Sequence, residues 1–204
     1  RQRQMCIRDS IYLVEQLQSL GYQVGVISRG YGSEIKQGTH LVTRGCTAKK
    51  VGDEPAMIVA RTGVFMAIGP NRSASIEQLM QHAKSQGRAI DLIVSDDGLQ
   101  HYAMARDIEI AVVDGQRFHG NGYRLPIGPL REPVERLNQV DFIVQNGGVL
   151  KRGFLMTLQS KGIVSLRGEK PAQSPWVALA GIGHPPRFFD TLSQMGLSIE
   201  QKIA

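Results

Sequence analysis

Short apolar runs alternate with amphipathic segments along most of this chain. The runs are rich in Val and Ile and have the length of strands; they cover residues 22–28, 64–68, 90–95, 108–114 and 141–145. Residues 11–20 are apolar at 13, 14, 17 and 20, the spacing of an amphipathic helix, and further helices are expected at 53–60 and 71–85. Strands that alternate with helices predict an α/β fold, with a mostly parallel sheet and helices on both faces.

Shorter elements complete the predicted order: strands at 41–43 and 176–182, weak β structure over 152–166, and helices at 134–139 and 185–195. Residues 1–10 show neither strand nor helix periodicity, so we expect a foreign or disordered tail there. The predicted core then covers residues 11–150, and residues 151–204 begin a smaller C-terminal α/β portion. Helix 11–20 has nothing before it to pack against, and no element is expected after Gly196, so the fold is expected to be incomplete at both ends.

The most informative run ends in two carboxylates, because Ile90–Ser95 leads directly into Asp96, Asp97 and Gly98. Open α/β folds bind ligands at the carboxyl ends of their parallel strands. A carboxylate at the end of a buried strand needs a partner, since an unpaired buried charge is costly. Mg²⁺ would satisfy it, because this ion is usually held by one or two carboxylates together with phosphates. The doublet alone is equally consistent with a solvated Asp-Gly turn.

Two further segments carry candidate chemistry. Asp53 and Glu54 precede Pro55 at a predicted helix start, where Asp is a good N-cap and acidic residues favour the helix dipole. Alternatively, this acidic site supplies a general base that accepts a hydroxyl proton during phosphoryl transfer, or an indirect partner of a bound metal ion. The proline-rich stretch 124–133 carries Arg124 and Arg131, whose guanidinium groups either are solvated on a rigid surface connection or clamp phosphate.

Weaker candidates are expected near the same sheet edge. Arg29 opens the stretch Arg29-Gly30-Tyr31-Gly32 at the end of a predicted strand, which is consistent with a simple tight turn. His101, four residues beyond Asp97, is either a ligand or substrate contact or a loop histidine with local partners. No Ser-His-Asp or Cys-His arrangement can be assembled from spacing alone.

The charge balance narrows the range of partners. The 204 residues carry a formal net charge of +6, which suits phosphate-bearing substrates or an anionic membrane surface. No basic stripe is interleaved with aromatic residues, which argues against nucleic acid. No apolar run approaches the roughly 18 residues needed to cross a bilayer. Cys6 and Cys46 offer neither metal-ligand spacing nor a disulfide framework.

The carboxylate strand resembles a Walker B segment, whose usual companion is a glycine loop containing Gly-Lys; that dipeptide does not occur in this chain. Four motifs are more specific in combination: SRGYG from residue 28, GDEP from 52, DDGLQH from 96 and GPLREP from 128. With these motifs in this order, residues 11 to about 200 resemble the tetraacyldisaccharide 4′-kinase family of lipid A biosynthesis.

The resemblance implies a P-loop NTPase-like kinase that transfers the γ-phosphate of ATP to the 4′-hydroxyl of a tetraacyldisaccharide 1-phosphate, forming lipid IVA. It implies ATP and Mg²⁺ as cofactors, a lipid disaccharide as substrate, and peripheral contact with the cytoplasmic face of the bacterial inner membrane. By this resemblance Asp53 and Arg131 are catalytic, Glu54, Asp96 and Asp97 serve Mg²⁺, and Arg29, Gln100 and His101 contact phosphates or substrate.

Three parts of the family pattern are missing from these residues: the P-loop lysine and threonine expected before Ile11, the family's N-terminal membrane-associating segment, and a His-containing segment expected after Ala204. We therefore expect the chain by itself to be inactive or nearly so, because phosphoryl transfer depends on positioning and charge stabilisation. The alternatives are another Mg²⁺-dependent P-loop ATPase or kinase, and a non-enzymatic nucleotide- or lipid-binding fragment.

Overall fold

The computed structural model describes residues 3–160, 162–165, 175–182 and 185–204. The chain divides into two compact units. The first runs to Val112 and includes Leu137–Phe142, and the second comprises Val113–Arg136 and Ile143–Ala204. The predicted division near residue 150 stays a prediction. Each unit is described by itself.

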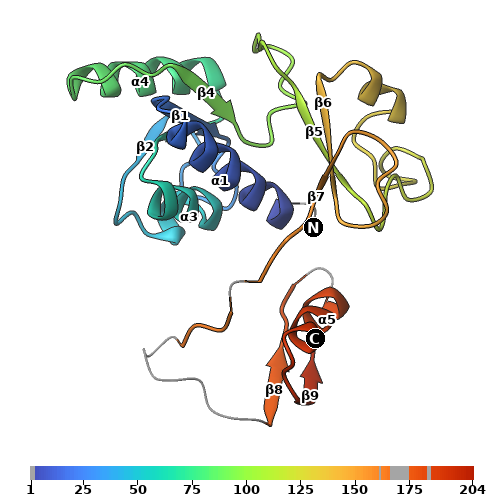
Figure 1. Cartoon of the computed structure of the whole chain (residues 1–204). Coiled ribbons are helices and arrows are strands. Elements are labelled where there is room, and N and C mark those ends of the chain that lie inside the picture. Colours follow the sequence, from blue (N-terminus) through green and yellow to red (C-terminus); the bar gives the residue numbers. More distant parts are fainter. Residues whose placement is uncertain (1–2, 161, 166–174, 183–184) are drawn as a thin grey trace. The chain divides into compact units, whose positions relative to one another are not determined.

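The first unit is built on a four-stranded sheet in the order β2-β3-β1-β4. Figure 1 labels β1, β2 and β4 together with the longer helices of this unit. Its strands are β1 (Val24–Ser28), β2 (His40–Val42), β3 (Phe65–Ile68) and β4 (Leu92–Ser95). The central strand β1 is buried along its whole length and pairs in parallel with β3 and β4, whereas β2 runs antiparallel to β3. In the register, Ser28 lies opposite Ile68 and Ile27 opposite Ser95. The three parallel strands therefore end together at one edge of the sheet.

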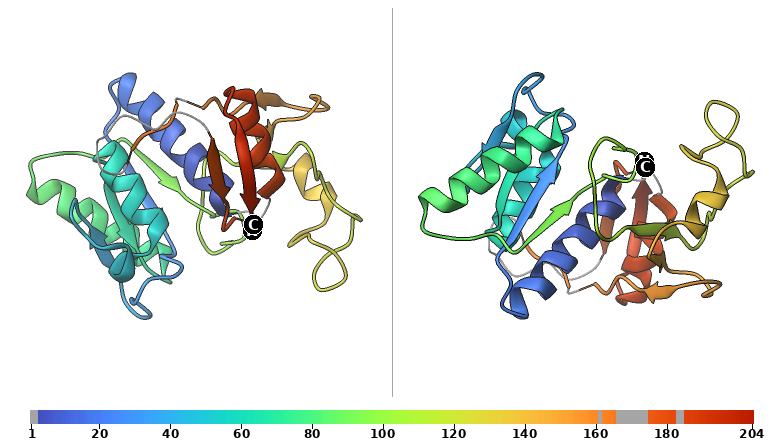
Figure 2. Two further views of the ribbon diagram at one scale, coloured as in Figure 1. Left: turned by 90° about the horizontal axis from the view of Figure 1, so that it is seen from below. Right: turned by 90° about the horizontal axis from the view of Figure 1, so that it is seen from above.

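Helices cover both faces of this sheet, as the turned views show (Figure 2). On one face, α1 (Arg3–Ser19) and α3 (Asp53–Thr62) contribute Val14, Ile58 and Val59 to a core with Val26 and Met66. On the other face, α4 (Arg72–Ser85) packs Leu79 against Ile27 and Ala67. The short helix α2 (Ala48–Val51) precedes α3. The predicted α/β architecture, a mostly parallel sheet between helices, is confirmed.

The second unit contains two smaller sheets. The first has the order β5-β6-β7. Its strands are β5 (Ile110–Asp114), which enters the second unit at Val113, β6 (Phe142–Asn146), which enters it at Ile143, and β7 (Phe154–Met156). The 3₁₀ helix η1 (Val134–Asn138) lies between β5 and β6 in sequence. The second sheet pairs β8 (Trp176–Leu179) in parallel with β9 (Ile199–Ile203). Helix α5 (Pro185–Gln194) buries Phe189 against Ala178 and Ala180.

Two local predictions of secondary structure were wrong, and one short helix was not predicted. Helix α1 begins at Arg3 rather than Ile11, because Ile7 extends the apolar stripe formed by Ile11, Val14 and Leu17. The prediction that residues 1–10 form no helix is therefore wrong from Arg3 onward, although a foreign origin of these residues stays a prediction. The prediction of no element after Gly196 is also wrong, because strand β9 lies there and pairs with β8. Helix α2, which spans a single turn, was not predicted at all.

Candidate functional site

The carboxyl edge of the four-stranded sheet gathers three loops of the first unit. The backbone N–H of Gly69, after β3, donates to the Ser28 carbonyl at 3.1 Å. The N–H of Asp96, after β4, donates to the Ile27 carbonyl at 2.9 Å. These hydrogen bonds continue the parallel ladders past the strand ends, so the loop that contains Arg29 and the loop that contains Asp96 and Asp97 begin beside each other.

Asp96 is the buried member of the carboxylate pair, with 4% of its surface exposed. The Ser10 hydroxyl on α1 donates to its Oδ1 at 2.7 Å. Burial raises the pKa of the Asp96 carboxyl, the Ser10 hydrogen bond opposes that rise, and the neighbouring Asp97 charge adds to it. Asp97 is exposed and has a left-handed backbone with φ 48°, which Asp tolerates better than most residues. The doublet thus presents one fixed and one exposed carboxylate.

Arg72 is a site residue that sequence reasoning missed. It occupies the first turn of α4, directly after the carboxyl end of β3, and is only 4% exposed. Its Nη1 donates to the Gly69 carbonyl at 3.2 Å, while its Nε is buried without a hydrogen-bond partner among the described residues. Burial lowers the pKa of the Arg72 guanidinium, and the charges of Asp96 and Asp97 oppose that shift. A buried cation therefore lies within the electrostatic reach of both carboxylates.

In the sequence, Arg72 can be recognised as a site residue by its position at a helix start, not by its being an arginine. Pro70 and Asn71 predicted the helix start, and the Asn71 side chain does cap α4 by accepting from the Ala74 N–H at 3.1 Å. A helix that starts at the carboxyl edge of a parallel sheet directs its first turn toward the ligand-binding edge. An arginine in that turn could have been included on this ground.

The Gly-Asp-Glu segment reaches the same edge through Gly52. This glycine has φ 92°, and a side chain on it would lie 2.7 Å from the Tyr31 carbonyl oxygen. The loop after β1, which contains Arg29, therefore packs directly against the start of α3. Asp53 is exposed in the first turn of α3 and Glu54 is half-buried beside it. The residue at the N-cap position is Gly52 rather than Asp53, so the capping role considered for Asp53 is not what the structure has.

The turn that follows the doublet is held by Arg106. Its Nη1 donates to the carbonyl oxygens of Gly98 at 2.8 Å and Leu99 at 3.1 Å, and its Nε lies 2.8 Å from a carboxylate oxygen of Glu109. Gln100 and His101 are half-buried within this turn, and the His101 N–H donates to the Gly98 carbonyl at 3.0 Å. Arg106 thereby holds the backbone of the turn that contains Gln100 and His101, the two predicted contact residues.

Arg131 belongs to the second unit, and its predicted place beside the carboxylates stays a prediction. It is exposed at the end of the proline-rich loop. Gly183 and His184, which follow the predicted strand 176–182, lie outside the described residues.

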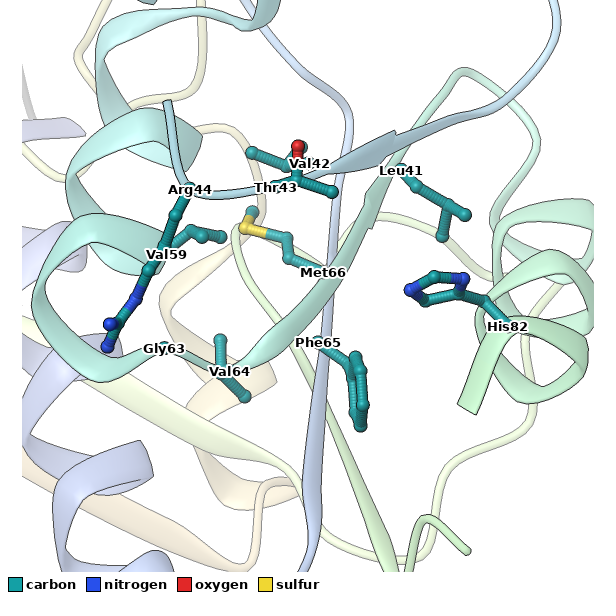
Figure 3. Close-up of a pocket in the computed structure, with 10 residues that line it drawn as sticks. All are labelled: Leu41, Val42, Thr43, Arg44, Val59, Gly63, Val64, Phe65, Met66 and His82. Carbon is teal, nitrogen blue, oxygen red and sulfur yellow. The ribbon is translucent and has the colours of Figure 1, made fainter. Parts of the chain in front are cut away.

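A shallow pocket of about 170 Å³ in the first unit lies away from this edge (Figure 3). It is bordered by β2, the end of α3, the start of β3 and His82 of α4. The His82 ring meets the Phe65 ring edge-on, with centroids 5.6 Å apart. Because Phe65 is the first residue of β3, the pocket lies toward the opposite end of that strand from the carboxylates.

The carboxylate donors fit a magnesium ion that is completed by phosphate oxygens. Across the described ranges, no group of three or more His, Cys, Asp or Glu side chains is arranged to hold a metal by itself. Magnesium usually takes one or two protein carboxylates and keeps water or phosphate in its other positions. The Asp96 and Asp97 pair offers those oxygens, with Asp96 held in place by Ser10.

Asp9 adds a third acidic group near Asp96. Both of its carboxylate oxygens are buried, and neither has a hydrogen-bond partner in the part of the chain that the structure describes. Burial raises the Asp9 pKa to about 6, the Arg8 charge opposes this, and the Asp96 charge contributes a further rise. Asp9 lies on α1 one residue before Ser10, so the N-terminal half of α1 places a carboxyl and a hydroxyl beside the sheet edge.

Comparison with known proteins gives a consistent result. The sequence model of the LpxK family, described as tetraacyldisaccharide-1-P 4′-kinase, matches residues 10–204. The tetraacyldisaccharide 4′-kinase of Actinobacillus pleuropneumoniae serotype 7 is 52% identical over 196 residues, which cover 93% of this chain and 59% of the relative. The enzyme of that name from Shewanella denitrificans is 48% identical over 201 residues, covering 95% of this chain and 59% of the relative. The chain therefore spans a little over half the length of these relatives.

A solved structure shares the fold. LpxK from Aquifex aeolicus, described as an "apo" form in complex with ATP, matches with a TM-score of 0.73 and 20% sequence identity. The match covers 97% of this chain and 65% of that chain. At this identity the likeness establishes the fold alone.

Proposed function

The chain belongs to the tetraacyldisaccharide-1-P 4′-kinase family, and from this membership we propose that its residues carry the carboxylate side of an ATP-dependent lipid kinase site. The reaction is transfer of the ATP γ-phosphate to the 4′-hydroxyl of a tetraacyldisaccharide 1-phosphate. One observation supports this proposal best. The Arg29 loop, the start of α3 and the Asp96–Asp97 doublet meet at one sheet edge, and the chain carries the family's motifs.

In the proposed reaction the 4′-oxygen forms a bond to the γ-phosphorus, and the bond from that phosphorus to the β,γ-bridging oxygen breaks, releasing ADP. Asp53 accepts the hydroxyl proton, a role that its exposed position at the start of α3 permits. Arg131 stabilises negative charge on the transferring group. Arg29, Gln100 and His101 contact phosphates or substrate.

Asp96, Asp97 and Glu54 would hold Mg²⁺, which when bound supplies charge neutralisation on phosphate oxygens. Asp96 is suited to this by its fixed orientation, since Ser10 occupies one oxygen and leaves the other for a ligand. The buried Arg72 lies near enough to balance part of the negative charge of the doublet. We assign Arg72 a positioning role, because its guanidinium is held against the Gly69 carbonyl.

The proposed substrate also implies a peripheral protein at the cytoplasmic face of the bacterial inner membrane. The formal charge of +6 supports contact with an anionic surface. Within the described residues, no helix is both long and apolar enough to cross a membrane.

A chimera tests the proposal directly. Residues 10–204 of this chain would replace the matching segment of the Actinobacillus relative, to which the chain is 52% identical. The chimera should phosphorylate the tetraacyldisaccharide 1-phosphate when ATP and Mg²⁺ are present, and Asp96→Asn or Asp97→Asn should abolish this. A folded chimera that hydrolyses ATP without phosphorylating the lipid would favour an ATPase. Phosphorylation that survives both substitutions would refute the assignment of the doublet.

A further inference from the structure

We propose that two loops of the second unit form a preformed surface that binds an anionic lipid bilayer. The first loop comprises residues 115–130 after β5, and the second comprises residues 147–153 after β6 (Figure 1). The two loops begin side by side, because the Gly115 N–H donates to the Asn146 carbonyl at 3.0 Å. They also touch farther along, where the Lys151 ammonium lies 4.2 Å from the centroid of the Phe118 ring. Together they are called the double-loop surface.

Large apolar side chains project from both loops into solvent. Tyr123, Leu125 and Ile127 alternate along the first loop and are 62%, 64% and 76% exposed. Val149 in the second loop is 82% exposed. Single exposed apolar residues are common on soluble proteins, but such a concentration on two adjoining loops marks an interaction surface.

Backbone hydrogen bonds fix the shape of the first loop. The Leu125 N–H donates to the Leu130 carbonyl at 2.8 Å, and the Gly128 N–H donates to the Arg124 carbonyl at 3.0 Å. The Asn121 amide donates to the Ile127 carbonyl at 3.1 Å. These hydrogen bonds hold the loop backbone in a conformation that leaves the side chains of Leu125 and Ile127 exposed.

A buried glutamine fixes the second loop in the same way. Gln145 is 2% exposed, and its Nε2 donates to the carbonyls of Gly147 at 2.9 Å and Val149 at 2.8 Å. Its Oε1 accepts from the Lys151 N–H at 3.1 Å. Because both loops are held before any partner arrives, binding would cost little ordering entropy.

The charged residues of both loops are cationic. Up to Leu130 the first loop contains Arg117 and Arg124 and no Asp or Glu, and the second contains Lys151 and Arg152 and no Asp or Glu. Glu132 follows in the sequence, beyond the double-loop surface. Cations around apolar tips, with a tyrosine among them, are the composition that favours the interface of a negatively charged bilayer.

Two other partners suit this surface less well. A second copy of the chain would bring the same cations together, and their repulsion would oppose association. Nucleic acid would leave Leu125 and Ile127 unused, since phosphate contacts need charge and base stacking needs aromatic rings. This inference rests on the proposed function, because a kinase that acts on a membrane lipid must reach the bilayer. Its test, however, measures only the binding of the chain to vesicles.

The test uses the 204-residue chain and vesicles that contain neither ATP nor the disaccharide. Co-sedimentation is measured with phosphatidylcholine vesicles, with and without phosphatidylglycerol. Binding is expected to require phosphatidylglycerol and to weaken at high salt. The variant Leu125→Ser/Ile127→Ser and the variant Arg124→Gln/Lys151→Gln should each weaken binding by about fivefold or more.

Matched controls come from outside the double-loop surface. Val177→Ser removes an apolar side chain that is 57% exposed on β8, and Lys49→Gln removes an exposed cation of the first unit. Both should bind as the unsubstituted chain does, and circular dichroism checks that every variant is folded. In a Trp176→Phe background, Tyr123→Trp should show a blue-shifted indole emission that brominated lipid quenches.

Any of several results would overturn the proposal: no binding to anionic vesicles, equal losses in the control variants, or an indole emission of the Tyr123→Trp variant that lipid leaves unchanged. Dimerisation that Leu125→Ser/Ile127→Ser abolishes would assign the surface to a second copy instead. A failure here leaves the phosphorylation assay of the chimera unaffected, so the two proposals fail separately.

Discussion

The hydroxyl of Ser10 donates a 2.7 Å hydrogen bond to Oδ1 of Asp96, joining α1 to the loop after β4. The two residues are 86 positions apart in sequence and both are buried. Asp96 thus reaches the sheet edge with one oxygen already engaged, which fixes the direction of the other. A carboxylate held this way suits a role in which its orientation matters.

Replacing Ser10 with alanine should destabilise the first unit by about 1–3 kcal/mol, because a buried carboxylate oxygen loses its donor. The loss should be larger at pH 8 than at pH 5. Burial has already raised the Asp96 pKa, and the Ser10 bond opposes that rise, so its removal penalises the ionised form most. Urea unfolding at both pH values measures the effect. Ser73→Ala, on the exposed side of α4, is the control and should change stability little.

Arg72→Met should destabilise the unit by about 2–4 kcal/mol at neutral pH, because two nearby carboxylates lose a buried cation. The effect should shrink when Asp96→Asn is also present, which a double-mutant cycle on urea unfolding would measure. Lys84→Met removes a cation from the last turn of the same helix and should be nearly neutral, because that position is exposed. Strict additivity of Arg72→Met and Asp96→Asn would show that the two side chains do not interact.

Ionisation of Asp9 should lower the free energy of unfolding as the pH rises through about 6. Its folded pKa lies above the value of 3.8 expected when unfolded, so the folded state binds the proton more tightly. Its favourable contribution is complete below pH 3.8 and disappears as the pH rises through 6. Asp9→Asn should therefore raise stability at pH 8 by about 1 kcal/mol, after allowance for solvent screening. Thermal unfolding at pH 5 and 8 tests this, and equal changes at both would contradict it.

Gly30 and Gly32 form a matched pair after β1. Both have positive φ, 68° and 79°, but a side chain on Gly30 would lie 2.9 Å from Cδ1 of Ile68, whereas one on Gly32 would meet none of the described atoms within 4 Å. Gly32→Ala should cost about 1 kcal/mol from backbone strain alone. Gly30→Ala should cost about 1–3 kcal/mol more, because Ile68 is fully buried and must move. Similar unfolding midpoints for the two variants would argue against this packing.

Asp53→Asn in the chimera should lower kcat by about 100-fold or more while leaving ATP affinity within about twofold, the result expected for a proton acceptor. Glu77→Gln, a carboxylate on α4, is the control. Single-turnover kinetics and nucleotide titration separate the two quantities. Equal losses of turnover and of ATP affinity would make Asp53 a structural residue of the α3 start.

The local pattern of apolar and polar residues was sufficient to predict the order of the main helices and strands and the polar residues that follow the strand ends. The apolar runs that became β1 and β3 can be recognised in the sequence, because strands buried on both faces need continuous apolar residues. The run that became β4 is equally apolar, but the burial predicted for it is wrong, because β4 lies at the edge of the four-stranded sheet and is only partly buried. Once three parallel strands are recognised, Arg29 and Asp96 must follow their carboxyl ends. The sequence by itself therefore determined the α/β class and the sheet edge that carries the candidate site.

Tertiary structure decided which polar groups are buried there and what holds them. The burial of Arg72, the Ser10 bond to Asp96 and the packing of Gly52 on Tyr31 all depend on segments that are separated in sequence. The extension of α1 to Arg3 and the pairing of β9 with β8 likewise depend on contacts across the fold. The physical reason is that the free energy of a buried polar side chain depends on the partners the fold brings to it, and no local periodicity encodes those partners.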